Sequence, residues 1–347
     1  MVYDRIMPPV DTLRAVLEIG EQFGDSTCSF GILMDARIDD RGRILVLDEL
    51  GACLKVFDIE GNYIQQVSGR GSGPGESRNV KGLFVMPDGR VGIMASDKKG
   101  YVVFDDSLRF VEEIGLWMQD SPYHATALSD SLLVMCRYDG SSESQCILQT
   151  VSIYRWGEPE WQTLLWKDSM EVGGSYPGDP SAVLRFALLD RLSTGGVGDG
   201  IVYFAPGSRY EYRVFGWDST GRQVLSITRE LAPVEKCLEQ IDYEIFYTGS
   251  SLQRRSTGHR PLPFEYQPEP YRGMVLDVGI GPDSNLWVRR GTCNEPFFDI
   301  YDLEGNLLRH AIYPDSAWDW QTEVTLHGVL AWELDPLEGY QKLYLLE

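Results

Sequence analysis

The clearest regularity in the sequence is an apolar–polar–apolar pattern that recurs along the chain. In each copy a β-branched residue and an aromatic residue end one apolar run, a polar turn follows, and another strand begins. This pattern is typical of two antiparallel strands joined by a tight turn. A recurrence every ~45 to 85 residues predicts separate β-units rather than one continuous sheet. The five copies are 56–64, 103–110, 153–158, 214–221 and 300–307.

A second recurring element precedes these hairpins and predicts two further strands. A turn, in most copies containing Asp, Gly or Pro, is followed by a nearly continuous apolar run, which suits a strand covered on both faces. A short apolar strand also precedes each turn, as at 82–86 and 274–278. Four strands in each of six units predict an all-β, six-bladed β-propeller of four-stranded antiparallel blades. The copies of this second element are 40–48, 87–94, 129–135, 198–204, 281–288 and 327–332.

The two ends of the chain complete one of these units. The last unit ends on the strand 342–346 and lacks a fourth strand, whereas the apolar stretch 13–19 has no unit of its own. Pairing the two closes the ring and removes exposed edges. We therefore expect a single domain over 1–347. The predicted blades are 31–70, 80–116, 122–166, 182–230, 271–313 and 321–347 with 10–20, and the predicted insertions are 168–180 and 231–270.

The insertion 231–270 is long enough to suggest a covering or binding loop. Pro233 introduces 234–247, which we expect to be a helix, and four prolines follow it.

Composition narrows the class of partner. The net charge of −21 disfavours nucleic acid and anionic membrane surfaces, both of which require clustered Lys and Arg. No apolar run approaches the ~18 to 20 residues of a membrane span. Six cysteines without a CxxC pair make structural zinc improbable. Cys136 and Cys146 flank a predicted hairpin loop, and a disulfide across its two strands is one hypothesis.

With these elements assembled, the chain resembles the six-bladed β-propellers of the NHL and TolB-like group, and more narrowly a bacterial six-bladed β-propeller family. The residues behind the likeness are the Gly-rich 69–76, the repeated Val-Phe-Asp…Gly-Asn hairpins and 285–288. Such family members are often secreted or lipid-anchored, so the resemblance implies a periplasmic or secreted protein. Residues 1–9 lack the apolar run of a signal peptide, so a cytoplasmic protein is the alternative to one whose leader has been removed.

The resemblance also raises the question of a metal, because lactonase-type propellers hold calcium or zinc in the channel. Several oxygen ligands must converge for calcium, and five residues could reach the loop face. No unit shows a distinctive acidic pattern on its inner strand. We therefore expect no metal site and no cofactor, with calcium as the alternative. The five residues are Asp48, Asn79, Asp97, Asn294 and Glu333.

Among the four histidines, His124 is the candidate acid or base. It begins the inner strand of the third unit beside Tyr123, near the channel mouth. The alternative is a structural histidine that is held by hydrogen bonds. His310 falls on an outermost strand and is expected at the surface, while His327 falls at a turn on the opposite face.

A group of basic and aromatic residues gives the stronger signal. They occupy loops between blades or between the middle strands, which lie on one face of the ring. Arginine binds carboxylates with two hydrogen bonds, and tyrosine offers a stacking face with a hydroxyl. The alternative is that these arginines pair with Asp and Glu between blades. The candidate ligand-binding residues are Arg78, Arg137, Tyr138, Arg209, Tyr210, Arg289 and Arg290.

Two functions follow from this reading. The first is a non-enzymatic scaffold that binds a peptide, glycan or acidic small molecule at the loop face over the channel. The second is a lyase or metal-assisted hydrolase of acidic sugars or lactones, in which arginines neutralise a carboxylate and Tyr123 or His124 moves the proton. Neither function involves nucleic acid or membrane insertion.

Overall fold

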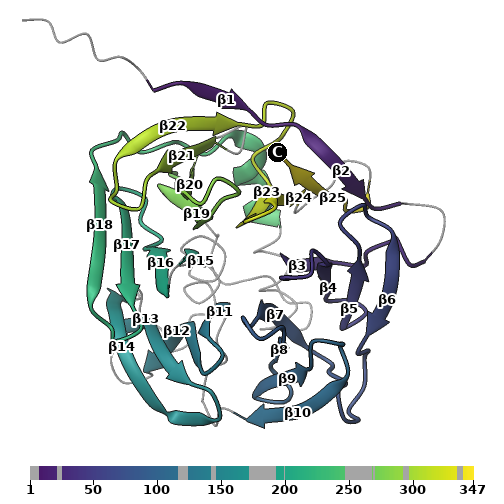
Figure 1. Ribbon diagram of the computed structural model, residues 1–347. Coiled ribbons are helices and arrows are strands. Elements are labelled where there is room, and N and C mark those ends of the chain that lie inside the picture. Colours follow the sequence, from purple (N-terminus) through teal and green to yellow (C-terminus); the bar gives the residue numbers. More distant parts are fainter. Residues whose placement is uncertain are drawn as a thin grey trace, which may run out of the picture.

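The strands of the computed structural model form six sheets around one axis (Figure 1). The structure describes residues 8–21, 26–115, 124–141, 146–171, 193–198, 200–246, 268, 270–291, 297–333 and 339–347. The all-β, six-bladed propeller predicted from the sequence is therefore confirmed. No helix in these ranges is long and apolar enough to cross a membrane.

Each blade is a four-stranded antiparallel sheet that runs outwards from the axis. Blades 1 and 2 are β3 (Leu33–Ile38), β4 (Ile44–Asp48), β5 (Cys53–Phe57), β6 (Tyr63–Val67) and β7 (Val80–Val85), β8 (Val91–Ala95), β9 (Gly100–Phe104), β10 (Phe110–Gly115). Blades 3 and 4 are β11 (His124–Ser129), β12 (Leu132–Ser141), β13 (Cys146–Arg155), β14 (Glu158–Glu171) and β15 (Ser193–Gly198), β16 (Ile201–Ala205), β17 (Tyr212–Asp218), β18 (Gln223–Arg229). Blades 5 and 6 are β19 (Val275–Ile280), β20 (Leu286–Arg290), β21 (Phe297–Tyr301), β22 (Leu307–Ile312) and β23 (Trp320–Thr325), β24 (Gly328–Glu333), β25 (Leu343–Leu346), β2 (Ala15–Ile19).

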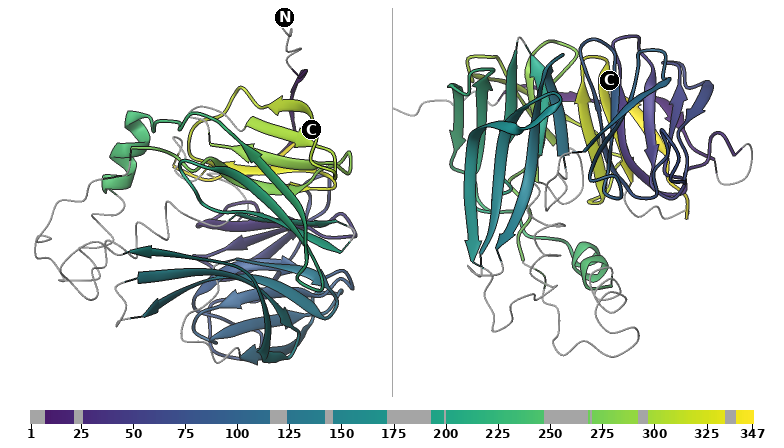
Figure 2. Two further views of the ribbon diagram at one scale, coloured as in Figure 1. Left: turned by 90° about the vertical axis from the view of Figure 1, so that its left-hand side faces the viewer. Right: turned by 90° about the horizontal axis from the view of Figure 1, so that it is seen from below.

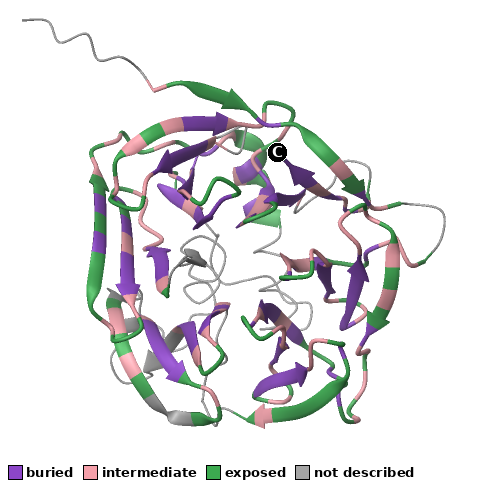
Figure 3. Ribbon diagram, viewed as in Figure 1, coloured by how far each residue is buried: buried purple, intermediate pink, exposed green. Residues whose placement is uncertain are grey.

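Burial follows the position of each strand within its blade. Every residue of the middle strands β4, β5, β8 and β9 is buried, because neighbouring blades cover both of their faces. The outer strand β6 alternates between exposed and less exposed positions, as expected for a sheet with one solvated face. Figure 3 shows the same change from the middle of a blade to its rim.

The N-terminal segment closes the ring in two places. β2 pairs antiparallel with β25, as the sequence predicted. In addition, β1 (Val10–Thr12) adds in parallel to β22, so blade 5 has a fifth strand. Between them, the Leu13 N–H donates to the carbonyl of Ile312 at 2.8 Å, and the Arg14 N–H donates to that of Glu347 at 2.7 Å. One short segment therefore connects the last two blades.

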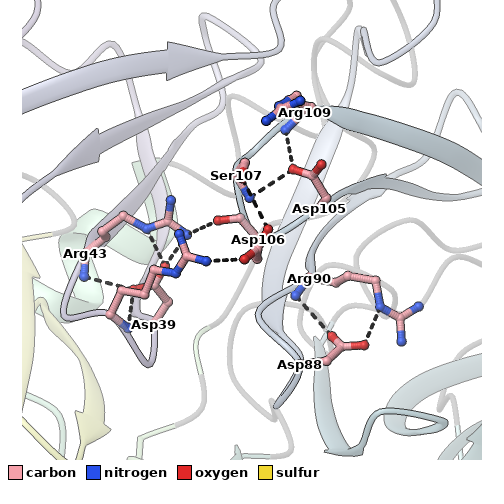
Figure 4. Close-up of polar contacts among 9 residues, drawn as sticks. Asp39, Arg43, Asp88, Arg90, Asp105, Asp106, Ser107 and Arg109 are labelled. Atoms are coloured by element: carbon pink, nitrogen blue, oxygen red, sulfur yellow. Dashed lines mark hydrogen bonds and ion pairs between the residues drawn. The ribbon is translucent and has the colours of Figure 1, made fainter.

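Arginines in the tight turns hydrogen-bond from one blade to the next (Figure 4). Arg43 Nε donates to Asp39 at 2.6 Å within its own turn, and its Nη2 donates to the carbonyl of Asp106 in blade 2 at 2.9 Å. Arg90 Nη2 donates in the same way to the carbonyl of Asp130 in blade 3 at 2.7 Å. These turns lie on the face opposite the loops between blades, and there arginine has a structural role.

Two features extend beyond the ring on the loop face (Figure 2). The strands β12 to β14 of blade 3 are 10, 10 and 14 residues long. β14 reaches Glu171, so the first residues of the expected insertion 168–180 are paired strand. In the insertion 231–270, a helix covers 238–246 and begins later than the expected 234, because Glu235 forms a β-bridge with Tyr271.

The register of blade 3 excludes the hypothetical disulfide. Cys136 lies opposite Val151, and Cys146 lies opposite Ser141, which is five residues further along β12. Five residues of extended strand span about 17 Å, well beyond the Cα separation of about 4.4–6.8 Å that a disulfide requires. The pairing failed because the hairpin turn is not centred between the two cysteines.

Candidate functional site

The inner strands β3, β19 and β23 of three adjacent blades lie around the axis of the ring (Figure 1). Charged and polar side chains of these strands contact one another and Arg289 of β20. Arg37 is at the centre of this group: its Nη1 lies 3.4 Å from Asp35 Oδ1 and forms an ion pair with Glu323 of blade 6. The three side chains are only 11%, 14% and 17% exposed. We call the group formed by Asp35, Arg37, Asp277, Arg289, Thr322 and Glu323 the axial cluster.

Asp277 extends the axial cluster into blade 5. Thr322 Oγ1 donates to Asp277 Oδ2 at 2.9 Å, and the Val278 N–H donates to Oδ1 at 2.8 Å. A register shift between Val275 and Asp277 places the aspartate opposite Arg289 on β20. Such irregularities often redirect a side chain beside a functional site. Burial raises the pKa of Asp277 to about 6, because the Thr322 hydrogen bond and the charge of Arg289 offset the loss of solvent only in part.

This raised pKa predicts an unusual dependence of stability on pH. The folded protein keeps the proton on Asp277 up to about pH 6, whereas an unfolded aspartate loses it near ~4. That stabilisation is fully present below about pH 4 and is lost as the pH rises to about 6. Arg37, Arg289, Thr322 and Glu323 are the groups that face this carboxyl.

We therefore expect Asp277→Asn to flatten the change of unfolding free energy between about pH 4 and 6, by roughly 1 to 3 kcal/mol. Thermal melts across this pH range measure the effect. Glu304→Gln, at an exposed turn position, is the control and should follow the wild-type profile. A wild-type slope that persists in the Asp277 variant would assign the titration to another group.

Of the two arginines in the axial cluster, Arg289 has the weaker contacts with negative charge, because Arg37 forms ion pairs with Asp35 and Glu323. It is 3% exposed, its Nη1 donates to Thr322 Oγ1 at 3.4 Å, and its Nε has no hydrogen-bond partner. Burial and the neighbouring positive charge of Arg272 lower the pKa of Arg289 to about 9, although Asp277 and Asp319 oppose this. Arg289 therefore remains charged at neutral pH. Its hydrogen-bond partner, the Thr322 hydroxyl, is neutral and 3.4 Å away.

The helix 238–246 lies over the loop face near this arginine and presents polar side chains to the propeller. Lys236, just before the helix, forms a 2.9 Å ion pair with Glu244, and Gln240 lies between them on the same face. All three are less than 10% exposed. Tyr243 packs on Trp318 of the loop between blades 5 and 6, with ring centroids 5.4 Å apart. The polar contacts thus stabilise the helical segment itself, and the aromatic contact holds it against the loop between blades 5 and 6.

Arg209 and Tyr210 lie beside this helix. The positive charges of Arg209 and Lys236 oppose the rise in the pKa of Glu244 that burial causes. Tyr210 is 61% exposed and packs edge-on against Tyr271, with centroids 5.8 Å apart. Among the predicted residues, these two therefore lie next to the segment that anchors the helix, and Arg289 lies closer to the axis, beside Thr322 and Asp277.

Arg290, in contrast, belongs to a contact between blades 4 and 5. Its guanidinium lies over the ring of Phe297, 5.2 Å from the centroid, and 3.9 Å from the fully buried Asp299. Arg229 reaches the same carboxylate at 2.7 Å. His310, expected at the surface, lies 2.8 Å from it and is 9% exposed. That expectation is wrong because β1 covers the outer strand that contains His310.

The other predicted residues are spread over the ring. Arg78 is exposed on the loop before β7, and its backbone N–H donates to Asp97 Oδ2 at 3.0 Å. Arg137, midway along β12 of blade 3, donates to the Tyr154 hydroxyl at 2.9 Å. His124 is half-buried at the start of β11.

Tyr123 and the side chain of Tyr138 lie outside the described residues. Asp35, Asp277 and Glu323 were missed, although each is an acidic residue within an inner strand, which corrects the view that no unit has such a pattern. The signal available was a carboxylate on a strand that faces the axis.

Two of the suggested calcium ligands hold loops together. Asp48 accepts hydrogen bonds from the N–H groups of Gly31 and Leu50 at 2.9 and 3.0 Å. Asp97 accepts one from the Ser77 hydroxyl at 2.7 Å. Within the described ranges no group of three His, Cys, Asp or Glu residues could hold a metal ion. The expectation of no metal, with calcium as the alternative, stays a prediction.

Comparison with known proteins supports the fold. Residues 25–149 match a family described as "6-bladed beta-propeller". No curated protein matches the chain. A putative exported protein from Bacteroides fragilis is 12% identical, with a TM-score of 0.52 over 97% of this chain and 98% of that one.

A member of the DUF4221 family from Bacteroides vulgatus is 9% identical, with a TM-score of 0.53 over 96% of this chain and 97% of that one. Regucalcin from Agrobacterium tumefaciens, a calcium-binding protein, is 12% identical with a TM-score of 0.49 over 97% and 95%. These identities show the fold alone. The family match over 25–149, together with the two Bacteroides structures, confirms the resemblance to bacterial six-bladed β-propellers, whereas the NHL and TolB-like subgroup stays a prediction.

Proposed function

Starting from a six-bladed β-propeller of this bacterial kind, we propose that the protein is a non-enzymatic scaffold that binds a peptide, glycan or acidic small molecule at the loop face over the channel. The supporting observation is that three segments bring basic and aromatic side chains to the loop face: Arg209 and Tyr210 from one loop, Tyr271 from the next, and Arg289 from the end of β20. Guanidinium groups and tyrosine faces are suited to acidic and ring-shaped ligands.

One observation favours the second candidate, an enzyme that acts on acidic sugars or lactones. Asp277 and Glu323 are buried carboxyl groups whose pKa values are both raised, chiefly by burial. Carboxyl groups of this kind are suited to proton transfer near neutral pH. In this version of the function, Asp277 replaces His124 as the residue that moves the proton.

A ligand screen tests the proposal. Purified protein is mixed with uronic acids, neutral sugars and short peptides, and its melting temperature is measured. We expect one ligand class to raise the melting temperature and to be recovered unchanged after prolonged incubation. Tyr210→Ala, at a residue that is 61% exposed, should weaken the effect without unfolding the protein.

Turnover decides between the two functions. Cleavage of uronate oligosaccharides or lactones that is lost in Asp277→Asn would establish the enzyme and overturn the scaffold. If no ligand class binds and no substrate is consumed, the loop face is not a ligand site for these compounds.

A further inference from the structure

We propose that Arg289 is the anchor of a buried subsite that binds a single carboxylate group of the ligand, between the axial cluster and the loop face. This inference rests on the proposed function, since it names the chemical group that the loop-face ligand must have. It does not require that the protein be an enzyme.

The first argument is the buried positive charge of Arg289, which has no carboxylate in direct contact within the described chain. A guanidinium that is 3% exposed has lost most of its hydration, which costs several kcal/mol unless a counter-charge replaces the water. No ion pair within 4.0 Å joins Arg289 to a carboxylate of the described chain, and its Nη1 has only the 3.4 Å contact with Thr322. Asp277 and Asp319 act on Arg289 only from a distance, so a bound anion would add a counter-charge in direct contact and a partner for Nε, which has none.

The second argument is the position of a second arginine. Arg272 lies close enough to lower the pKa of Arg289 by direct repulsion. The two strand ends also approach closely here, because a Cβ at Gly291 would lie 1.8 Å from the carbonyl oxygen of Gly273 and 3.5 Å from Cβ of Arg272. Two like charges in a buried site repel each other, and an anion between them removes that repulsion. Arg272 Nη2 also donates to the carbonyl of Trp318 at 2.9 Å, which links it to the loop under the helix.

The third argument identifies the ligand as a monoanion. Asp277 and Asp319 both act electrostatically on Arg289. Their negative charge would repel a phosphate dianion more strongly than a carboxylate. The planar guanidinium fork also matches a carboxylate with two parallel hydrogen bonds. Uronic acids and the C-terminal carboxylate of a peptide share this group.

Calorimetric titration with sodium glucuronate and with N-acetyl-triglycine distinguishes these two sources. We expect one of them to bind the wild type, and glucuronamide or the tripeptide amide to bind more weakly. Arg289→Gln should lower the affinity for the carboxylate ligand by about 10- to 100-fold. The weak affinity for the neutral amide should not change. Arg222→Gln, at a turn on the opposite face where the side chain is 77% exposed, is the control.

Arg289→Lys gives the same test if the glutamine variant does not fold. Lysine keeps the positive charge but cannot make the two parallel hydrogen bonds of a guanidinium. The carboxylate ligand should therefore bind this variant more weakly, while the melting temperature of the variant matches that of the wild type. Equal affinity of wild type and both variants for the carboxylate would overturn the subsite while leaving the loop-face scaffold intact. Binding of neither acid to the wild type would reject the subsite, and the broader screen would then decide the scaffold separately.

Discussion

Replacing Arg37 with methionine is expected to lower the free energy of unfolding by about 3–5 kcal/mol. Arg37 is paired with Asp35 and Glu323 at the axis of the ring, where the side chains are between 11% and 17% exposed. Without the guanidinium, two buried carboxylates lose their positive partner, and Asp277 also loses a favourable charge. Urea denaturation at neutral pH measures the change.

Arg222→Met is the matched control for this prediction. Arg222 also pairs with an aspartate, Asp218, at 3.1 Å, but its side chain is 77% exposed. Exposed pairs contribute about 0–1 kcal/mol, so this variant should unfold almost like the wild type. Equal losses in both variants would mean that the axial carboxylates do not depend on Arg37. The Arg37 variant should also regain part of its stability at acid pH, because protonation of the carboxyl groups removes the unpaired charge.

Ile19→Ala is expected to destabilise the protein by about 2–5 kcal/mol. Ile19 is 4% exposed on β2 and lies in a core cluster shared by blades 1 and 6, together with Leu343 and Leu345. Its strand closes the ring through β25, so a cavity there weakens the contact between the chain ends as well as the core. Thermal unfolding monitored by circular dichroism measures the loss.

Val16→Ala separates this closure effect from a general sensitivity of β2. Val16 lies on the same strand but is 55% exposed, and surface substitutions usually change stability by less than about 0.5 kcal/mol. If both variants lose the same amount, β2 contributes through its backbone pairing rather than through the buried side chain.

Part of the candidate site could be predicted from sequence, and part could not. Arg289 was identified because a charge at the end of a buried strand is conspicuous. The adjacent Arg290 shares that pattern but turns towards Asp299 between two blades. Adjacent strand residues point to opposite faces of a sheet, and only the packed ring shows which face leads to the axis and which to the next blade.

The sequence by itself determined the number of blades, the four strands in each and the pairing of the chain ends, because these depend on local apolar runs and turn residues that repeat. The tertiary structure decided the rest. Asp35, Asp277 and Glu323 are far apart in sequence, and they meet only because three inner strands surround one axis. β1 was equally hidden: all three of its residues are exposed, so no apolar pattern marks a strand that is held by backbone pairing with β22 and by the ion pair of Asp11 with Arg309.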